Sequence, residues 1–383
     1  MGTLGVLGGG QLGLYFVVAA RSMGFGTVVL DPDPDSPAGR AADMHIVAGY
    51  EDEAALLALA DRCDAVTVEF ENPAVSSLQF LEQRITVRPS SRAVAIGQDR
   101  RMEKSMCLDL GLATAPFDVI ETDSDVRRVI DSGRAGRPIA RRPYVLKTAR
   151  LGYDGRGQER FDTLDSLAGA WERTGKVPCV LESMVPLDAE FSVILARSTT
   201  GDTAVYAPTR NTHVNGILDI SSAPYAGPTG GNLAVVEEGR LAALMIAEHL
   251  DYAGVMAVEF FVSGGALLVN EIAPRPHNSG HWTMDAAHTS QFGQQVRVLA
   301  GLPLGDTSML FPAVSMANIL GDLWATGEPR FENASLGPGT HVHLYGKNSP
   351  RAGRKMGHMT VTGDSVRDTE NRARQGRADA SAR

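Results

Sequence analysis

Cysteine is scarce in this chain of 383 residues, and its three copies, Cys63, Cys107 and Cys179, are far apart in the sequence. An odd number of cysteines without a Cys-x-x-Cys pair excludes a disulfide framework and a thiolate zinc site. This usage is typical of a reducing compartment. We therefore expect a cytoplasmic protein whose cysteines fill small buried spaces.

Excess positive charge is also missing, because 36 Lys and Arg stand against 45 Asp and Glu, for a formal net charge of −9. Proteins that bind nucleic acid or anionic membranes depend on positive charge, so we expect neither kind of partner. Long apolar runs are absent too, since glycines interrupt the N-terminal stretch. A membrane-spanning helix needs about 20 mostly apolar residues, and no membrane anchor or signal peptide is expected here.

Glycine and proline, by contrast, are abundant, with 41 and 20 copies, which predicts many tight connections. The length predicts two or three domains. Residues 1–97 alternate short strands and helices, as in a Rossmann-like domain with a parallel sheet. Residues 98–312 have the pattern of an α+β domain with antiparallel hairpins, and residues 313–363 that of a small β-rich domain. Residues 364–383 have almost no large apolar side chains and predict a flexible tail.

The first strand, residues 3–7, runs into a glycine-rich turn in which Gly8, Gly10 and Gly13 match G-x-G-x-x-G. Asp31 follows the second strand, where a dinucleotide-binding domain has its ribose-binding acid. The motif is weak by itself. It is equally consistent with a phosphate or carboxylate at a helix N-terminus, or with a tight turn that binds nothing. Gln11 adds a polar side chain to the turn.

Polar residues also follow the third strand, in the segment Glu69-Phe70-Glu71-Asn72. Open α/β sheets bind ligands at the carboxyl ends of their strands, so Glu71 and Asn72 are candidates for substrate contacts. A capping cluster before Pro73 is an equally good interpretation.

A second glycine-rich loop, residues 152–158, follows a strand that contains Lys147. A lysine beside such a loop can bind phosphate while backbone N–H groups cover the anion, although a purely structural loop is possible. No G-x-x-x-x-G-K-[ST] motif occurs, so a nucleotide would be bound by another fold. Glu182 and Glu190 come next. Either can accept from a ribose hydroxyl, and either can simply be solvated.

The hairpin around Ser263-Gly264-Gly265 brings two carboxylates together. If these three residues form the loop, Glu259 faces Val269, and Glu271 lies two residues further along on the same face. Diagonal neighbours of this kind are about 7–8 Å apart, close enough to share an ion. A two-residue loop would instead put the acids on opposite faces. Mg²⁺ bound to nucleotide phosphates would neutralise such a pair. The alternative is one exposed, solvated acid.

Two further segments are rich in hydrogen-bond donors. The segment at residues 274–281, PRPHNSGH, contains Arg275, which can bind phosphate or carboxylate in a bidentate manner. Zinc binding by His277 and His281 is disfavoured, because Pro and Gly prevent the helix that would align them. The second segment, residues 346–358, interleaves Lys347 and Arg354 with glycines, which suggests a loop around an anion, although it can also be solvated surface.

Taken in order, GGGQLG, EFEN, QDR with EK, LGYDGRGQ, VEFF with VNEIAPRPHNSGHWT, and YGK with RAGRKMGH extend over nearly the whole chain. This series closely resembles the 5-(carboxyamino)imidazole ribonucleotide synthase family of ATP-grasp enzymes in purine biosynthesis. The resemblance implies that residues 98–312 are an ATP-grasp domain whose small lid subdomain covers about residues 115–182. It also implies a homodimer.

The resemblance further implies the site residues. Mg²⁺ would be held by Glu259 and Glu271. ATP, as cosubstrate, would contact Arg100, Lys147, Gly152, Tyr153, Asp154, Gly155, Arg156, Gly157, Gln158, Glu182, Ser183, Met184, Val185, Glu190, His213, Asn270 and Glu271. The aminoimidazole ribonucleotide would be bound by Gly10, Gln11, Leu12, Glu71, Asn72, Arg275, Lys347 and Arg354. The catalytic residues would be Tyr153, Asp154, Arg275, His277, Asn278 and Lys347.

The implied reaction carboxylates 5-aminoimidazole ribonucleotide. ATP phosphorylates bicarbonate to carboxyphosphate, and the ribonucleotide amine then takes the carboxyl group, releasing ADP and phosphate. The product would pass to a mutase. Carboxyphosphate is short-lived in water, which suits a glycine loop that closes over the site. Asp154 would handle the amine proton or orient the amine.

Three other classes compete with this interpretation. An NAD-dependent oxidoreductase would need only the first glycine turn, and it leaves the paired acids unexplained. A related ATP-grasp ligase, such as a formate-using transformylase or a biotin carboxylase, would share the nucleotide site but differ in the APRPHNSGH and RKMGH segments. A non-catalytic ATP-binding module should lack one of the two metal carboxylates.

Overall fold

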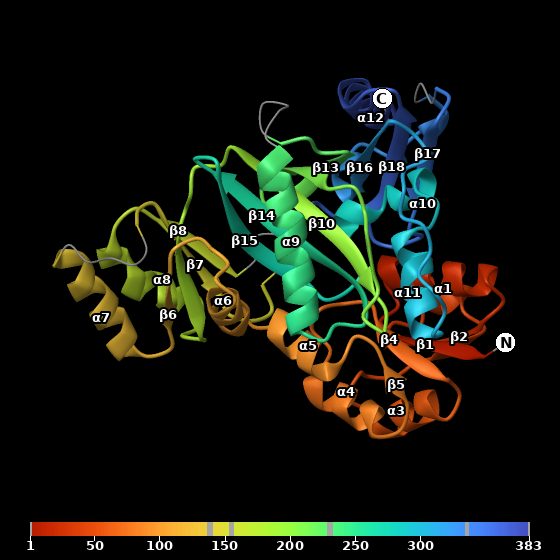
Figure 1. Ribbon diagram of the computed structural model, residues 1–383, viewed down its shortest axis with the longest axis horizontal. Helices are drawn as coiled ribbons and strands as arrows, with labels where there is room; N and C mark the ends of the chain where they lie inside the picture. Colours follow the sequence, from red (N-terminus) through yellow and green to blue (C-terminus); the bar gives the residue numbers. More distant parts are fainter. Residues whose placement is uncertain (1, 136–140, 153–156, 228–232, 334–336, 382–383) are drawn as a thin grey trace.

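The computed structural model of the protein describes residues 2–135, 141–152, 157–227, 233–333 and 337–381. Three β-sheets organise these residues. Figure 1 shows an N-terminal domain in red and orange, a small lobe in yellow that stands apart on one side, and a large central sheet that runs from green to dark blue.

The N-terminal domain is a parallel sheet with helices, as the alternating pattern predicts. Its elements are β1 (Thr3–Leu7), α1 (Gln11–Ser22), β2 (Gly26–Leu30), α2 (Pro37–Ala41), β3 (Met44–Ile46), α3 (Glu53–Ala60), β4 (Ala65–Val68), α4 (Val75–Glu82), β5 (Thr86–Val87) and α5 (Ser91–Gly97). The strand order is β3-β2-β1-β4-β5, and the four pairings are parallel. The carboxyl ends of β1 and β4 are therefore adjacent, which brings the glycine turn beside the Glu69–Asn72 segment.

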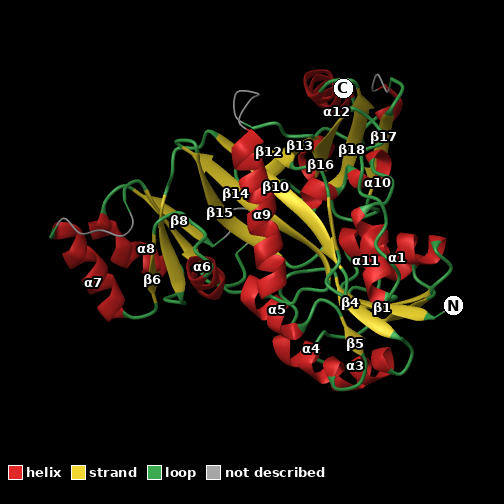
Figure 2. Ribbon diagram, viewed as in Figure 1, coloured by secondary structure: helices red, strands yellow, loops and turns green. Residues whose placement is uncertain are grey.

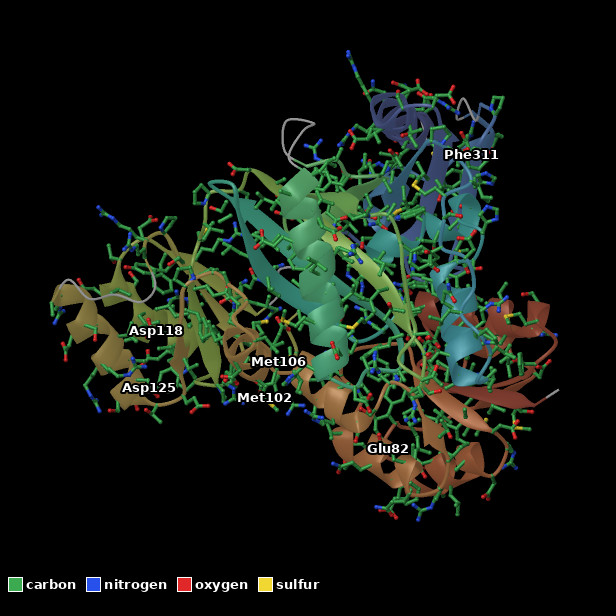
Figure 3. The ribbon with its side chains drawn as sticks, viewed as in Figure 1. Glu82, Met102, Met106, Asp118, Asp125 and Phe311 are labelled. Atoms are coloured by element: carbon green, nitrogen blue, oxygen red, sulfur yellow. The ribbon has the colours of Figure 1, made fainter. Side chains whose placement is uncertain are left out.

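The small lobe is an antiparallel sheet of order β6-β9-β7-β8 with two helices. Its elements are β6 (Phe117–Ile120), α7 (Asp123–Arg134), β7 (Tyr144–Thr148), β8 (Gln158–Phe161), the 3₁₀ turn η1 (Leu164–Ser166), α8 (Leu167–Arg173) and β9 (Cys179–Ser183). Leu146, Trp171 and Leu181 are buried together in a core that belongs to this lobe alone. Figure 3 marks Asp118 on β6 and Asp125 on α7 within it.

Helix α6 (Arg100–Asp109) joins the small lobe to the rest of the molecule. Figure 3 shows its Met102 and Met106 between the lobe and the central sheet. Met106 and Cys107 are buried in the core of the central sheet, whereas Met102 is 47% exposed. The helix therefore packs with one face on the central body and presents the other to solvent.

The central sheet has nine strands in the order β15-β14-β10-β12-β13-β16-β18-β17, with β11 paired to β10. Helix α9 lies across one of its faces (Figure 2). No helix among the described residues is long and apolar enough to cross a membrane. The elements are β10 (Ala189–Arg197), β11 (Thr203–Val205), β12 (Thr209–Val214), β13 (Ile217–Ala223), α9 (Leu233–His249), β14 (Gly254–Ser263), β15 (Ala266–Ala273), η3 (Asn278–Gly280), α10 (Thr283–Ala286), α11 (Gln291–Leu299), β16 (Ala313–Leu320), η4 (Gly321–Trp324), η5 (Phe331–Asn333), β17 (Thr340–Leu344) and β18 (Lys355–Gly363).

The C-terminal strands do not form a sheet of their own. Strand β16 is antiparallel to β13, and β18 lies between β16 and β17. The strands expected in residues 313–363 are present, but they extend the sheet that begins in the middle of the chain. Backbone hydrogen bonds thus tie the two regions together.

The expectation of a flexible tail from residue 364 is wrong. Residues Val366–Asp379 form a helix, α12. Ser365 caps its N-terminus, because the Ser365 Oγ accepts from the N–H of Asp368 at 3.3 Å. Thr369, Ala373 and Ala380 of this segment are fully buried. Because these side chains are small, the composition of the segment suggested too little apolar surface for folding. Their small size lets the helix approach β16 and β18 closely, and Arg377 ties it to Asp219 at 2.5 Å.

We predict that Ala373→Leu destabilises the protein, because a larger side chain does not fit between α12 and the sheet. The expected loss is about 1–3 kcal/mol in the free energy of unfolding, measured by urea denaturation. Arg367→Leu, at an exposed position of the same helix, is the matched control and should change this free energy little. Equal stability of the Ala373 variant and the control would contradict the close packing.

Candidate functional site

A cavity of about 460 Å³ lies where the N-terminal domain, the small lobe and the central sheet meet. It lies at the carboxyl end of the N-terminal parallel sheet, the place where such sheets bind ligands. Most of the residues predicted for the site line it, namely Gln11, Leu12, Glu71, Arg100, Lys147, Gln158, Glu182, Ser183, Met184, Val185, Glu190, His213, Glu259, Asn270, Glu271, Arg275, His277 and Asn278. Residues far apart in the sequence thus form one site.

The remaining predicted residues lie at its edges or outside it. Gly10 precedes α1 and is next to Gln11. Asn72 and Gly152 line a small adjoining pocket, which Glu71 and Glu271 also line. The carbonyl of Gly157 accepts from the N–H of Thr148 at 2.8 Å.

Two basic residues complete this comparison. Lys347 contacts the cavity residue Gln11, whereas Arg354 donates to the carbonyl of Ser349 at 2.8 Å and does not line the cavity. Tyr153, Asp154, Gly155 and Arg156 lie outside the described residues.

The first glycine turn is held by a carboxylate of the protein itself. Asp31 accepts from the N–H of Gly9 at 2.6 Å and from the hydroxyl of Tyr50 at 2.6 Å. A Cβ at Gly13 would lie 2.4 Å from the carbonyl oxygen of Gly8, so only glycine fits at that position. Asp31 is 7% exposed and hydrogen-bonded inside the turn, so it is not presented to a ribose. The interpretation as a dinucleotide-binding domain therefore lacks the acidic residue that would bind the ribose.

Lys347 connects the two ends of the chain beside the cavity. Its Nζ donates to Oε1 of Gln11 at 2.6 Å and to the carbonyl of Lys355 at 3.0 Å. Gln11 is the first residue of α1, so the C-terminal region reaches the glycine turn directly. The positive side chain of Lys347 thus lies next to a helix N-terminus, an arrangement suited to an anionic ligand, and Lys355 also lines the cavity.

Glu182 and two lysines form a buried ionic cluster on the small-lobe side. Lys147 Nζ lies 2.6 Å from Oε2 of Glu182, and Lys104 Nζ lies 2.9 Å from Oε1. Burial alone would raise the pKa of Glu182, but the two lysines lower it to about 2. Burial lowers the pKa of Lys147, with Glu182 opposing that shift. The cluster holds net positive charge at the cavity wall, where a phosphate can replace part of the contact with Glu182.

Glu259 and Glu271 face each other directly across β14 and β15. The expected register, with Glu259 opposite Val269, is wrong, because Ser263 pairs with Ala266 and the loop has only two residues. Both loop glycines have positive φ, 56° and 78°, which a two-residue type I′ turn requires.

A β-bulge then restores the predicted neighbourhood of the two acids. Phe260 pairs with Val269, whereas Glu259 pairs with Glu271, so Asn270 is an extra residue in β15. Without the bulge, a two-residue loop would place the acids on opposite faces. Bulges of this kind often orient side chains beside active sites. Here it brings both carboxylates, and Asn270 with them, to the cavity wall.

The two carboxylates have different surroundings. Burial raises the pKa of Glu259 to about 7; the positive charge of His213 opposes this shift, and Glu271 adds to it. Arg100 Nη2 lies 3.4 Å from Oε2 of Glu271. Two opposed carboxylates with the amide of Asn270 beside them are hard oxygen donors, so this set fits Mg²⁺.

His213 and Glu190 form a polar contact on the same wall. Nδ1 of His213 lies 2.5 Å from Oε2 of Glu190. Burial alone would lower the pKa of His213, but the carboxylate of Glu190 raises it. The pair joins neighbouring strands, because Glu190 lies on β10 and His213 on β12. It can present both a donor and an acceptor to a nucleotide.

Arg275, His277 and Asn278 lie on the segment that follows β15. Arg275 forms an ion pair with Glu71 of the N-terminal domain. Burial lowers the pKa of His277, whose Nε2 lies 3.7 Å from Oε1 of Glu259. The amide oxygen and nitrogen of Asn278 are buried without a hydrogen-bond partner among the described residues, and Asn278 lines the cavity. Such groups call for a polar ligand.

Several lining residues were not predicted. Lys355 and Arg160 add positive charge, whereas Leu218 and Phe261 add apolar surface suited to a base. Lys104 does not line the cavity, but it forms an ion pair with Glu182, which does. Lys355 belongs to the basic segment already noted, and Lys104 belongs to the QDR-with-EK motif. The sequence could therefore have identified both as site residues. Arg160 and the apolar residues had none, since β-strand positions of this kind are common.

Glu103 is a buried acid behind the carboxylate pair. It is 2% exposed, and its Oε2 accepts from the N–H of Ile272 at 3.3 Å. Burial raises the pKa of Glu103 to about 8, and Glu271 adds to the shift, while Arg100 and Lys104 oppose it.

We predict that Glu103→Gln stabilises the protein relative to wild type, increasingly so as the pH rises toward 8. In the unfolded chain a glutamate loses its proton near about pH 4.3, whereas folded Glu103 keeps it to about pH 8. The wild-type protein therefore loses stability across that window, and the Gln variant avoids this part of the loss. Urea unfolding at about pH 5 and about pH 8 measures it, with exposed Glu172→Gln as the control. A difference independent of pH would refute the raised pKa.

Known protein families match the chain in three successive parts. The ribonucleotide synthetase preATP-grasp domain matches residues 1–98, the ATP-grasp domain residues 105–292, and the phosphoribosylaminoimidazole carboxylase C-terminal domain residues 314–372.

Whole proteins agree with this division. The N5-carboxyaminoimidazole ribonucleotide synthase of Brucella melitensis is 40% identical over 361 residues, which cover 94% of this chain and 95% of that protein. The crystal structure of the synthetase from Thermus thermophilus is similar, with a TM-score of 0.88 and 37% identity, covering 100% of this chain and 99% of that one. The enzyme from Aspergillus clavatus, solved in complex with ADP and 5-aminoimidazole ribonucleotide, has a TM-score of 0.86 at 28% identity, covering 99% and 98%. The chain belongs to the N5-carboxyaminoimidazole ribonucleotide synthase family of ATP-grasp enzymes.

Proposed function

We propose that this chain carboxylates 5-aminoimidazole ribonucleotide with bicarbonate at the expense of ATP. The products are 5-(carboxyamino)imidazole ribonucleotide, ADP and phosphate. The observation that carries the proposal is that one cavity joins a buried lysine on the small lobe, an opposed pair of carboxylates and a basic region next to a helix N-terminus. An ATP-dependent ligase needs these three features for nucleotide, metal and anionic acceptor. A role in purine biosynthesis follows from the family.

ATP binds between the small lobe and the central sheet in this proposal. Lys147 contacts its phosphates, helped by Arg100 and the backbone of the glycine loop around Gly152 and Gly157. The segment Glu182–Val185 lies along the base and ribose, with Glu190 and His213 as polar partners. This assignment is supported by the lining of the cavity and by the buried charge of Lys147. The family resemblance extends it to Tyr153, Asp154, Gly155, Arg156 and Gln158.

Glu259 and Glu271 would hold Mg²⁺ next to the phosphates, with Asn270 beside them. Bound there, Mg²⁺ neutralises charge on the phosphoryl group during its transfer. The support is the direct opposition of two acids, one of them buried. Arg100 contacts Glu271 and restrains this carboxylate when no cation is present.

Bicarbonate and carboxyphosphate would bind near Arg275, His277 and Asn278. In the transfer, a bicarbonate oxygen attacks the γ-phosphorus, and the bond from phosphorus to the β-bridging oxygen breaks, leaving ADP. Arg275 is held by Glu71, so its guanidinium is fixed before the anion binds. The unpartnered amide of Asn278 can donate to a carboxylate oxygen. His277, whose pKa is lowered by burial, stays neutral and can accept a hydrogen bond.

The ribonucleotide would bind on the N-terminal side, against Gly10, Gln11 and Leu12, with Glu71, Asn72 and Lys347 around it. Arg354 does not line the cavity and belongs to this proposal only through the family resemblance. Lys347 and the N-terminus of α1 favour a phosphate there. The amine attacks the carboxyl carbon of carboxyphosphate, and phosphate leaves. Asp154 takes the amine proton or orients the amine. A homodimer, and transfer of the product to a mutase, belong to the same proposal through the family.

The reaction itself is tested by measuring phosphate release with ATP, Mg²⁺ and bicarbonate, alone and with one acceptor at a time. We expect 5-aminoimidazole ribonucleotide to raise ADP release and to be consumed in equal amounts. Formate with a ribonucleotide, and biotin, should have no effect. Biotin-dependent or formate-dependent turnover would reject the assignment in favour of a related ligase.

Two substitutions separate the halves of the site. Glu271→Gln should lower kcat/KM for ATP at least about 100-fold, since a metal ligand is lost. Lys347→Ala should raise KM for the ribonucleotide about 10-fold or more and change KM for ATP little, because it removes a charged contact to that substrate.

Lys176→Ala, at an exposed ion pair with Asp123 on the small lobe, serves as the control for both. Wild-type turnover by the Glu271 variant would refute its role in metal binding. A Lys347 variant that fails equally toward both substrates would refute the division of the cavity.

A further inference from the structure

A second group of potential metal ligands lies where α10 packs against β17 and β18. Asp285 comes from α10, and His343 and His358 are directly opposed on the two strands. One donor atom of each residue lies within 4.8 Å of the donor atoms of the other two. None of the three is among the described residues that line the large cavity. The group is therefore separate from the ATP and ribonucleotide sites.

The contact between His343 and Asp285 has the spacing of two ligands on one ion. Nε2 of His343 lies 3.1 Å and 3.0 Å from the two carboxylate oxygens of Asp285. Zinc binds nitrogen and oxygen at roughly 2.0–2.2 Å, so two ligands of a tetrahedral ion lie roughly 3.3 Å apart. A small shift of either side chain would let a cation replace the shared proton.

His358 supplies the observation that a hydrogen-bonded pair alone does not explain. It is fully buried, and its Nε2 has no hydrogen-bond partner among the described residues. Its Nδ1 lies 3.0 Å from the hydroxyl of Tyr345. If Nδ1 donates to that hydroxyl, Nε2 presents a lone pair, as in histidines that bind metals.

The strand pairing holds the two imidazoles next to each other. The rings of His343 and His358 are stacked with centroids 4.6 Å apart and an interplanar angle of 20°. Nδ1 of His341, on the same face of β17, lies 3.8 Å from Oδ1 of Asp285 and is the next nearest donor. Two imidazoles and one carboxylate leave one tetrahedral position for water or His341.

We propose that Asp285, His343 and His358 bind a divalent transition-metal ion, with Zn²⁺ the best match to two nitrogen donors and one oxygen donor. Mg²⁺ is a poor match, because it prefers six oxygen ligands, so the two sites of the protein select different cations. The ion links α10 to the C-terminal hairpin. Tyr345, the partner of His358, also lies near Lys347, whose Nζ is 5.4 Å from the centre of the Tyr345 ring.

The test is titration of chelator-treated protein with Co²⁺ and with Zn²⁺, in the presence of excess Mg²⁺ to occupy the carboxylate pair. Visible absorption of bound Co²⁺ reports its geometry, and calorimetry gives the stoichiometry and affinity of Zn²⁺. We expect one equivalent of either ion, and a melting temperature that Zn²⁺ raises. Asp285→Asn and His343→Asn should each weaken binding at least about 100-fold, which exceeds the usual effect of losing an outer partner.

Two controls assign the signal to this group. Glu271→Gln, at the carboxylate pair, and His288→Gln, at an exposed histidine near α10, should bind Zn²⁺ as wild type does. His343 is partly exposed, so its variant should fold even if the Asp285 variant does not, and circular dichroism verifies this. No binding in the presence of Mg²⁺, unchanged binding in His343→Asn, or loss of binding in Glu271→Gln would each overturn the proposal. None of these results would bear on the carboxylation activity, which the phosphate-release assay tests separately.

Discussion

The opposition of Glu259 and Glu271 is the constraint on which the site depends. Two carboxylates at one cross-strand position repel each other, and burial makes that repulsion stronger. The protein accommodates them with Arg100 beside one acid and a raised pKa at the other. A cation would relieve the same repulsion, so binding energy is available at the point where charge must be neutralised. Around Glu182 the excess charge is positive, because two lysines contact this one carboxylate, and this charge favours an anion.

The site also depends on contacts between distant parts of the chain. Gln11 and Lys347 are 336 positions apart, and Glu71 and Arg275 are 204 apart, yet each pair is in contact. Both pairs join the N-terminal domain to the rest of the molecule at the cavity. The glycine turn is rigid because Asp31 holds it from within, so these contacts have a fixed partner. The cavity therefore forms only where the domains of the chain meet, and it does not belong to any one domain.

Much of the fold could be predicted from periodicity, because strands with apolar runs and glycine turns have strong local signals. β1 begins and ends as predicted, and β14 and β15 form the predicted hairpin. The register could not be predicted, since Ser-Gly-Gly permits a loop of two or three residues and no residue type in β15 marks the bulge at Asn270. Helix α12 was missed because its contact face consists of small residues, which hydropathy counts as weakly apolar. Residue types and motif order predicted most of the cavity wall, whereas Arg160 and the cluster at Asp285 depend on three-dimensional packing.

The continuous strand pairing from β15 to β17 has a mechanical consequence. Hydrogen-bonded strands do not slide easily past one another. The acid pair and the hairpin that leads to Lys347 therefore behave as one rigid sheet. The small lobe has its own sheet and its own core, and it can pivot on this rigid sheet without disturbing it. If the lobe swings, a nucleotide bound as proposed can enter and leave while the proposed ribonucleotide pocket keeps its shape.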